Sequence, residues 1–482
     1  MTRACRSLTF LALIVLARYG FAQVAGNPKI GKVENGLLPP VLINGEHKVY
    51  SIQERLAFYK IPGVSVVVID HFQIDWAKGY GYRDKEQKLP VDPNTLFEAG
   101  SISKPVAAVG ALSLVEQHKL ALDEDVNRKL SSWKVPENSF TAQQKVTLRR
   151  LLSHSAGLTV HGFPGYQRGL PLPTVVQVLN GIKPANTGPV RVDIVPGTQF
   201  RYSGGGFTIM QLLVMDVAGT AFPDFMARTV LRPFGMTHST YEQPLPDGLT
   251  GNAATGYANG SPIPGKYNTY PEMAAAGLWT TPSDLAKFAI ELMNSAHGRS
   301  NIVLSKDMTA QMLSKQKDEW GLGIGWKETP SSPVFQHGGV DEGFESMLVG
   351  IQEPGKGAVV MTNGEGGMAL AEEIVRSIAA EYGWPTYHPK EFTKIEPDPK
   401  VLETYDGEYQ LDPNFSIKIT HEGDRLFAQA TNQPKFELFE TKPNEFFAGE
   451  FEAQMTFVAA GNGKVSALVL HQGRDHTAPK LK

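Results

Sequence analysis

The sequence predicts an α/β (α+β) domain followed by a small all-β domain. Two patterns indicate the mixed class: a β-branched strand at 64–70 with a hairpin partner at 72–82, and an apolar run at helical spacing that begins near Ser101. A break in composition at 383–400 indicates the second domain, because short strands separated by turns follow from Tyr405 onward. A chain of 482 residues is long enough for two or more domains.

The N-terminal segment 1–22 predicts a signal peptide. Two arginines precede an apolar run over 8–17, and Gly20 and Ala22 occupy the positions that a signal peptidase reads. A membrane anchor is the alternative, but this run of about ten residues is shorter than the roughly 20 that a bilayer span needs. We therefore expect a secreted or periplasmic protein with no integral membrane span after the signal is removed.

The charge and cysteine content of the chain exclude several classes of function. Cys5 is the single cysteine and would leave with the signal, so the mature chain would hold no disulfide, thiol nucleophile or cysteine metal site. The formal net charge is −3, and losing the three arginines of 1–22 would take it to −6, which argues against nucleic acid as a partner. His-Glu-x-x-His does not occur, so a zinc protease is not indicated. We expect no metal and no cofactor.

Three predicted elements precede the apolar helix. A segment at 23–50, rich in proline, glycine and asparagine, is expected to wrap the surface, and 53–59 predicts a short helix. Residues 64–70 are mostly β-branched, which favours a central strand, and 72–82 predicts its hairpin partner.

Ser101 and Lys104 open the apolar helix. Pro105 fits only the first turn of a helix, which fixes the start to within a few residues. Residues three apart share one helix face, so a hydroxyl at the positive helix end would have an amine one turn away. Such an amine is a candidate base for a serine nucleophile. The same spacing occurs at 131–134 and 314–317, but no buried helix follows either pair.

The middle of the chain mixes helices with a long surface segment. Residues 146–158 predict a helix that ends at Gly157, and we interpret His154 as a polar residue at that helix end rather than a catalytic one. Few periodic signals occur at 160–200. Three consecutive glycines at 204–206 allow a positive φ or a close backbone approach before an apolar helix at 207–217. The remaining predicted elements are helices at 285–293 and 372–382 and strands at 320–326, 335–339, 346–351 and 358–362.

The composition predicts where the domains end. We expect the mixed domain at 23–385, a linker at 386–400 and the small all-β domain at 401–482, because four prolines and mixed charge at 383–400 are typical of a linker. No residue set in the last domain indicates chemistry. Its strands are predicted at 407–411, 416–421, 425–430, 435–440, 446–448, 455–459 and 465–471, which favours a barrel or half-barrel.

Three short motifs occur in a fixed order: Ser101-x-x-Lys104, Tyr202-Ser203-Gly204 and His337-Gly338-Gly339. This order resembles the serine β-lactamase and penicillin-binding protein superfamily, in particular class C β-lactamases, whose motifs are Ser-x-x-Lys, Tyr-x-Asn and Lys-Thr-Gly or His-x-Gly. Residues 151–157 and 275–281 also resemble that family, and the likeness covers about 45–385. The C-terminal part is similar to the lipocalin-like β-domain often appended to such hydrolases.

The resemblance implies a β-lactamase/transpeptidase-like fold, an antiparallel sheet flanked by helices plus a helical lobe, with the site between them. Ser101 would attack a carbonyl and form an acyl-enzyme, and the backbone N–H groups of Ser101 and Val340 would form an oxyanion hole worth about 3 kcal/mol per donor. The implied catalytic residues are Ser101, Lys104, Tyr202 and His337. The implied oxyanion and substrate-binding residues are Val340, Gly338, Gly339 and Gly204.

Either Lys104 or Tyr202 fits the role of general base. A lysine in water is neutral at pH 7 about once in a few thousand molecules, so a basic lysine needs its pKa lowered by about 3 units through burial or a nearby cation. A tyrosine, with an ordinary pKa of about 10, would need cations close to it. Lys104 and His337 are the candidates for those cations.

Two positions depart from the family pattern. Gly204 stands where the family usually has asparagine, which removes an amide that would contact the substrate or the lysine. His337 stands where penicillin-recognising members have lysine, and a histidine is mostly neutral at pH 7, so it offers no fixed charge to a substrate carboxylate. Both departures favour esterase-like or peptidase-like members over efficient β-lactamases.

The sequence therefore predicts a secreted serine hydrolase that cleaves ester or small amide bonds through an acyl-enzyme on Ser101. Its expected partner is a small-molecule ester, amide or peptide substrate. One alternative is a peptidase or carboxypeptidase acting on D-amino peptides, or a true β-lactamase. Another is a catalytically silent ligand-binding homologue, which Gly204 keeps open. An α/β-hydrolase is not supported, because Gly-x-Ser-x-Gly does not occur.

Overall fold

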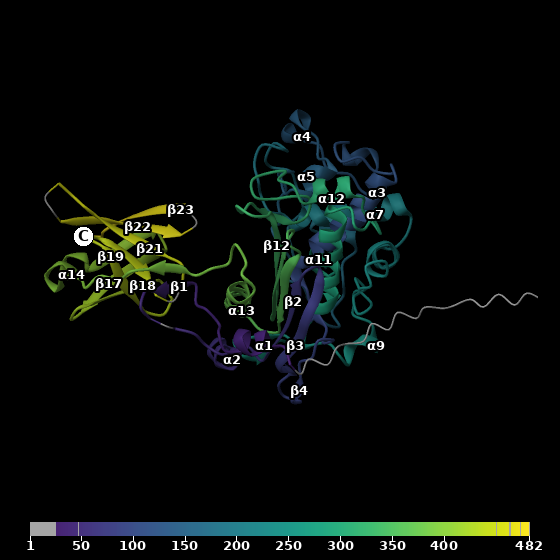
Figure 1. Cartoon of the computed structure of the whole chain (residues 1–482). Coiled ribbons are helices and arrows are strands. Elements are labelled where there is room, and N and C mark those ends of the chain that lie inside the picture. The colour runs from purple at the N-terminus through teal and green to yellow at the C-terminus, as the bar shows by residue number, and fades with distance from the viewer. Residues whose placement is uncertain (1–25, 47, 450, 462–463, 473, 482) are drawn as a thin grey trace, which may run out of the picture.

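The structure is a computed structural model, and it describes residues 26–46, 48–449, 451–461, 464–472 and 474–481. These residues form a mixed domain and a C-terminal barrel, which lie side by side (Figure 1). The expected signal peptide at 1–22 lies outside the described residues, so its cleavage stays a prediction.

A seven-stranded antiparallel sheet forms the centre of the mixed domain. The predicted hairpin is confirmed: β2 (Gly63–Asp70) pairs with β3 (Gln73–Asp84) and lies inside the sheet. In spatial order the strands are β11 (Gly325–Lys327), β12 (Val334–Asp341), β13 (Phe344–Ile351), β14 (Lys356–Thr362), β2, β3 and β4 (Leu89–Pro90).

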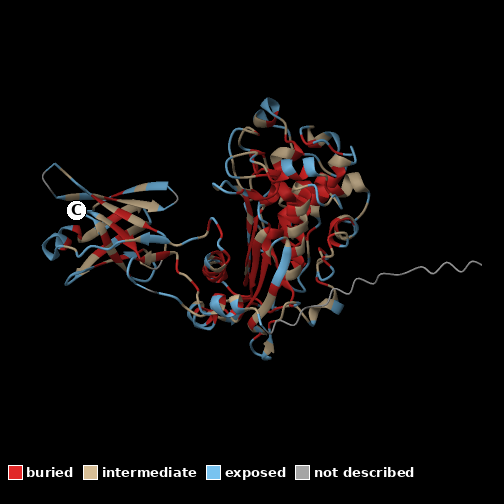
Figure 2. Cartoon of the chain, in the orientation of Figure 1, coloured by how far each residue is buried: buried red, intermediate tan, exposed pale blue. Residues whose placement is uncertain are grey.

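Helices cover both faces of this sheet. On one face lie α1 (Pro28–Glu34), α2 (Ile52–Tyr59) and α13 (Gly367–Tyr382), and on the other lies α11 (Pro282–Ala296). Side chains alternate along β2, so Val66 and Val68 join the core under α13 while Val67 and Ile69 join the core on the α11 side. Burial on both faces explains why β2 is a continuous apolar run (Figure 2).

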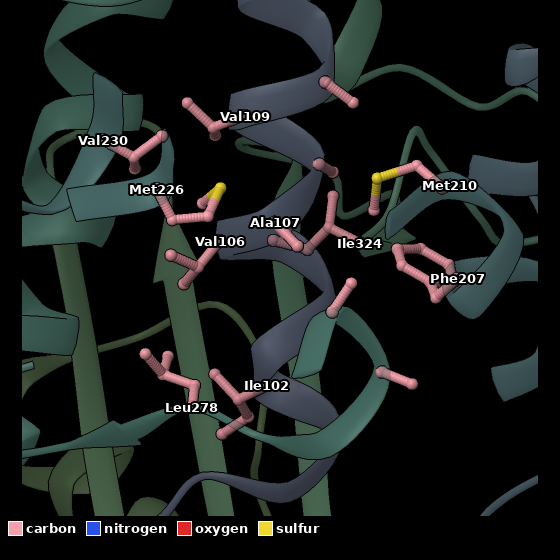
Figure 3. Close-up of a cluster of buried hydrophobic side chains, with 14 of the residues drawn as sticks. Ile102, Val106, Ala107, Val109, Phe207, Met210, Met226, Val230, Leu278 and Ile324 are labelled. Carbon is pink, nitrogen blue, oxygen red and sulfur yellow. The ribbon is translucent and has the colours of Figure 1, made fainter. Parts of the chain in front are cut away.

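A helical lobe packs beyond α11 and is centred on α3 (Ser103–Glu116). Twelve of the 14 residues of α3 are buried, so this helix is enclosed by the protein. Figure 3 shows buried apolar side chains on two flanks of the helix, such as Met226 on one and Ile324 on the other. A 3-10 turn at Gly100–Ile102 precedes it, which confirms a helix start near Ser101. The other lobe helices are α4 (Ser139–Gln143), α5 (Leu148–Leu152), α6 (Val175–Asn180), α7 (Gly204–Ala218), α8 (Phe222–Met226) and α12 (Lys306–Met312).

Short elements connect the lobe to the sheet. They are β5 (Phe97–Glu98), β6 (Tyr166–Gln167), α9 (Asp247–Thr250), β7 (Tyr257–Ala258), β8 (Ser261–Pro262), β9 (Asn268–Thr269), α10 (Met273–Ala276) and β10 (Trp279–Thr280).

Three predicted elements differ from the structure. The helix predicted over 146–158 is only α5, because the chain reverses at His154, whose φ is +53°. The glycines at 204–206 form the first turn of α7 rather than a preceding turn, although they do allow close packing, since a Cβ at Gly205 would lie 2.8 Å from a Val190 methyl group. The strand predicted at 320–326 is wrong over most of its length, since β11 begins only at Gly325.

The C-terminal domain is a nearly closed antiparallel barrel of eight strands in sequence order. Its last strand meets its first through a bridge between Tyr409 and Lys480, and α14 (Pro399–Tyr405) leads into it. Inward side chains such as Tyr409 and Phe457 form one hydrophobic core. The strands are β16 (Gly407–Asp412), β17 (Phe415–Glu422), β18 (Arg425–Ala430), β19 (Phe436–Lys442), β20 (Glu445–Ala448), β21 (Gln454–Ala459), β22 (Val465–Gln472) and β23 (Arg474–Pro479).

The segment between the domains carries structure of its own. Within the expected linker 386–400, β15 (Lys390–Phe392) pairs in parallel with β1 (Val41–Ile43). The ring of Phe392 stacks on that of Phe447 with centroids 4.4 Å apart, so this two-stranded pair packs against the outside of the barrel. The contact holds the segment after α13 close to both domains.

Within the described ranges, no single helix has the length and apolar composition of a bilayer span, and only the bent pair 204–218 with 222–231 passes that test.

Candidate active site

Ser101 and Lys104 lie at the N-terminal end of α3. Lys104 Nζ is 2.8 Å from Ser101 Oγ and 2.7 Å from the carbonyl oxygen of Ala275. These two hydrogen bonds hold the amine in place. Because Lys104 is only 2% exposed, water barely reaches it. The pair has the separation that a serine nucleophile and its base require.

The turn that carries Ser101 packs directly against β12. Gly100 has a φ of +52°, a left-handed conformation that favours glycine, and a Cβ there would lie 2.5 Å from the backbone nitrogen of Val340. A Cβ on Gly339 would overlap the carbonyl oxygen of Ala99. This close approach brings the Val340 backbone nitrogen beside the nucleophile turn.

Tyr202 lies beside Lys104 and is fixed by His154. Lys104 Nζ is 5.0 Å from the centroid of the Tyr202 ring. The His154 ring stacks on the same ring at 4.1 Å with 26° between the planes, and its Nδ1 accepts a hydrogen bond of 3.1 Å from the backbone N–H of Ser203. Burial and the Lys104 charge lower the pKa of His154 well below its usual range, so it packs as a neutral ring.

His337 points from β12 toward the same group of side chains. Its ring centroid is 6.5 Å from that of Tyr202, and it is 5% exposed. Its Nδ1 donates a hydrogen bond of 2.6 Å to the carbonyl oxygen of Gly338, which leaves Nε2 as the unprotonated nitrogen. Burial and the nearby Lys104 lower the pKa of His337 to about 3, so the imidazole is neutral at pH 7.

Trp320 is a site residue that sequence reasoning missed. Its ring centroid is 5.0 Å from that of His154, 5.8 Å from Tyr202 and 5.4 Å from His337. The sequence predicted a strand there, but residues before Gly325 form a loop that turns the indole toward the site. The sequence around Trp320 gives only a weak indication of a place in the site, because a tryptophan after a charged run is compatible with many structural environments.

A cavity of about 1440 Å³ contains most of the implied residues. Gly339 and Gly204 do not line it: Gly339 packs behind the cavity wall, and the Gly204 backbone N–H donates to the carbonyl oxygen of His161 at 2.9 Å. The implied residues that do line it are Ser101, Lys104, Tyr202, His337, Gly338 and Val340. Residues more than 200 positions apart in sequence thus meet in one place.

Three buried carboxyl groups lie near this site, on Glu98, Glu272 and Asp341, and Asp341 also lines the cavity. Burial, and the charge of Asp341, raise the pKa of Glu98 well above its usual range, and burial does the same for Asp341. Burial raises the pKa of Glu272 to about 7. Sequence reasoning did not find these groups, because their burial depends on the folded lobe.

Replacing Glu272 by glutamine is expected to make stability less dependent on pH. Between pH 4.5 and 7 the folded chain holds a proton on Glu272 that the unfolded chain releases, so this group's contribution is complete below about pH 4.5 and is lost as the pH rises through about 7. The loss is about 3 kcal/mol, at about 1.4 kcal/mol per pKa unit. Urea unfolding at pH 5 and pH 8 measures the free energy of unfolding. Relative to wild type, this free energy should be higher for Glu272→Gln at pH 8 than at pH 5. In the exposed control Glu242→Gln, the free energy of unfolding should depend on pH as it does in wild type. The same pH dependence in Glu272→Gln as in wild type would refute the raised pKa of Glu272.

In the part of the chain that the structure describes, no group of three or more His, Cys, Asp or Glu side chains is placed to hold a metal ion.

Comparison with known families agrees with the fold. The Beta-lactamase family model matches residues 51–382, more than half of the chain, and the chain therefore belongs to the β-lactamase family, whose members are typically serine hydrolases. A second family, Domain of unknown function (DUF3471), matches residues 392–480, which include the barrel. The resemblance drawn from the three motifs is confirmed at the level of the superfamily.

The chain is also similar to individual relatives. It is 22% identical over 458 residues to Penicillin-binding protein 4* of Bacillus subtilis (strain 168), covering 87% of this chain and 95% of the relative. It is 23% identical over 370 residues to Protein flp of Staphylococcus aureus (strain N315), covering 75% of this chain and 69% of the relative.

Solved structures show the same fold. The octameric penicillin-binding protein homologue from Pyrococcus abyssi matches with a TM-score of 0.60 at 21% identity, over 89% of this chain and 98% of that one. SurE in complex with D-Leu matches with a TM-score of 0.55 at 20% identity, over 89% and 97% of the two chains. At these identities the likeness defines the fold, which is the expected β-lactamase/transpeptidase-like one.

Proposed function

We propose that this chain hydrolyses carboxylic esters or small amides through an acyl-enzyme on Ser101. The observation that carries the proposal is the 2.8 Å hydrogen bond between Lys104 Nζ and Ser101 Oγ, in the wall of a cavity that also holds Tyr202 and His337. A buried amine in contact with a serine hydroxyl is the arrangement that an activated nucleophile needs.

In the proposed reaction, Ser101 Oγ gives its proton to the base and attacks the substrate carbonyl carbon. The backbone N–H groups of Ser101 and Val340 hold the resulting oxyanion, a role supported by the close packing of Gly100 on Val340. The intermediate collapses to an ester on Ser101, and the leaving alcohol or amine takes the proton. A water molecule then attacks the acyl-enzyme by the same route. Lys104 is the favoured base, because its amine contacts Ser101 directly.

The neutral state of His337 favours esters over β-lactams. With a pKa of about 3, this imidazole supplies no positive charge for a substrate carboxylate at pH 7. Its free Nε2 can instead accept a hydrogen bond from the substrate. Peptidase activity on D-amino peptides remains the second candidate, supported by the likeness to the SurE structure that contains D-Leu.

A labelling experiment and a substrate panel test the proposed function. Wild type treated with an alkyl fluorophosphonate should gain the mass of one adduct and lose its turnover of p-nitrophenyl acetate, whereas Ser101→Ala should show neither adduct nor turnover. Ser131→Ala is the matched control, since Ser131 and Lys134 have the same spacing in an exposed loop. An adduct that persists in Ser101→Ala would refute the proposal. Faster turnover of nitrocefin or a D-alanyl peptide than of esters would favour the second candidate function over ester hydrolysis.

We also propose that the chain is secreted, on the basis of the N-terminal pattern. Sequencing the mature N-terminus should give a start near residue 23, and an intact N-terminus on the cell-associated protein would contradict secretion.

A further inference from the structure

The cavity that contains Ser101 continues across β12 to the α13 side of the sheet. Side chains alternate along β12, and its burial pattern places His337, Gly339 and Asp341 toward the helical lobe. Gly338 and Val340 therefore face the opposite side, and the cavity includes them. The nucleophile thus lies at one end of a space that extends well beyond it.

We propose that this extension is a subsite for a linear apolar chain of the substrate, so that the preferred substrates are medium-chain esters or amides. The inference rests on the proposed function, because it uses Ser101 as the point where the chain is attached. It adds a substrate class that the catalytic residues alone do not define.

The floor of the extension is apolar. Val340 is 60% exposed and lies beyond Gln336, the last residue of β12 that pairs with β11. Met347 stands directly opposite Gly338 in the strand pairing, so its side chain is on the same face, and Met368 from α13 lies beside it, where a Cβ on Gly338 would come within 3.1 Å of its methyl carbon. Flexible thioethers adapt to chains of different shape, and the glycine leaves the passage open.

Most ionic side chains at the rim are already paired. Arg376 lies 3.5 Å from Glu372, and Lys390 forms an ion pair with Glu452 of the barrel. Lys327 donates a hydrogen bond of 3.3 Å to Thr386 Oγ1. Three further acidic residues line the cavity: the two at 318–319 lie on the loop with Trp320, on the Tyr202 side, and Asp341 faces the helical lobe. The extension therefore offers apolar contact along its floor and no unpaired acid at its far end.

The segment after α13 lines the far end of the extension. Tyr387 has a φ of +63° and its hydroxyl donates to the side-chain carbonyl oxygen of Gln336 on β12, which anchors this segment as a wall. Lys390 and Glu452 also line the cavity. The whole cavity, at about 1440 Å³, exceeds the roughly 300–1,000 Å³ of pockets for drug-sized ligands, so it has room for a chain of about eight carbons as well as the reacting group.

A chain-length series tests the subsite. For p-nitrophenyl esters of two to twelve acyl carbons, kcat/KM of wild type should rise about twofold for each methylene up to about eight carbons, somewhat less than the full burial of a methylene would give. A parallel series of acetate esters with longer alcohols shows on which side of the ester bond the subsite lies. A rise in the first series places the apolar chain in the acyl group, and a rise in the second places it in the leaving group. A flat response in both series would overturn the proposal while leaving ester hydrolysis itself intact.

Variants of Met368 connect the effect to the proposed floor. Met368→Gln should lower the ratio of the eight-carbon to the two-carbon rate at least threefold, and Met368→Leu should retain the ratio. Met215→Gln is the matched control, because Met215 is a half-buried methionine of α7 outside the cavity. An unchanged ratio in Met368→Gln would refute the assignment.

A binding measurement separates this proposal from the proposed function. Calorimetric titration of Ser101→Ala with octanamide should show binding at least tenfold tighter than with acetamide, and Met368→Gln should weaken the octanamide binding. This result does not depend on turnover, so it would support the apolar subsite even if no ester were hydrolysed. Equal affinities for the two amides would overturn it.

Discussion

Replacing Lys104 by methionine is expected to lower kcat/KM for a short ester at least a thousandfold. Methionine fills a similar volume but can neither accept the Ser101 proton nor donate to the Ala275 carbonyl oxygen, from which Lys104 Nζ is 2.7 Å away. General acid–base catalysis typically contributes 10²- to 10⁴-fold, and the amine also orients the serine hydroxyl. Steady-state kinetics on p-nitrophenyl acetate measure the loss.

A second readout shows whether the effect is electrostatic rather than structural. The Lys104 charge is one of the two causes of the low pKa of His337, and burial is the larger one. In Lys104→Met the pKa of His337 should therefore rise above about 3 toward its usual range, which an NMR titration of the imidazole would detect. A structural role for Lys104 alone would not change that pKa in this direction.

Two controls complete the experiment. Lys315→Met removes an exposed lysine outside the cavity and should leave kcat/KM unchanged. Tyr202→Phe tests the other candidate base: if Tyr202 is the base, this variant should lose as much activity as Lys104→Met. Activity of Lys104→Met within tenfold of wild type would exclude lysine as the base and as the group that orients Ser101.

The elements that the sequence predicted well are those whose signal is local. The β-branched run of β2 and the apolar run of α3 each extend over at least seven residues, and each is nearly continuous because the element is buried on all sides. Strand β23 was missed because its residues are mostly polar, with Ala478 as its one fully buried member, so no alternation marks it. The barrel itself was predicted from the strands before it.

Some parts of the candidate site could be predicted from the sequence more fully than others. The contact of Ser101 with Lys104 follows from helical spacing, so elementary geometry was sufficient. The meeting of that pair with Tyr202 and His337 depends on the tertiary fold, and only the order of the three motifs pointed to it. His154 and Trp320 belong to the site because their rings contact residues that are distant in the sequence. No local pattern encodes such contacts.

The close packing of β12 on the nucleophile turn leads to the second large effect. Gly339→Ala is expected to lower kcat/KM about a hundredfold and to destabilise the fold by about 1–3 kcal/mol. The new Cβ would overlap the Ala99 carbonyl oxygen and lie 3.0 Å from its carbon and 3.3 Å from Ile102 Cγ1. The nearest of these atoms belong to backbone, so the turn bearing Ser101 must move, and a displacement of about 1 Å at a reacting group can cost that much in rate.

Gly338→Ala is the matched control for this prediction, because the neighbouring glycine faces the other side of the sheet. The atom nearest to its Cβ would be the flexible methyl end of Met368 at 3.1 Å, so the turn at Ser101 need not move. Turnover of p-nitrophenyl acetate should therefore stay within a fewfold of wild type, while the eight-carbon ester should lose more, since the added methyl group narrows the way to the apolar extension. Equal losses for Gly338→Ala and Gly339→Ala on the acetate would show that the nucleophile is not positioned through this strand contact.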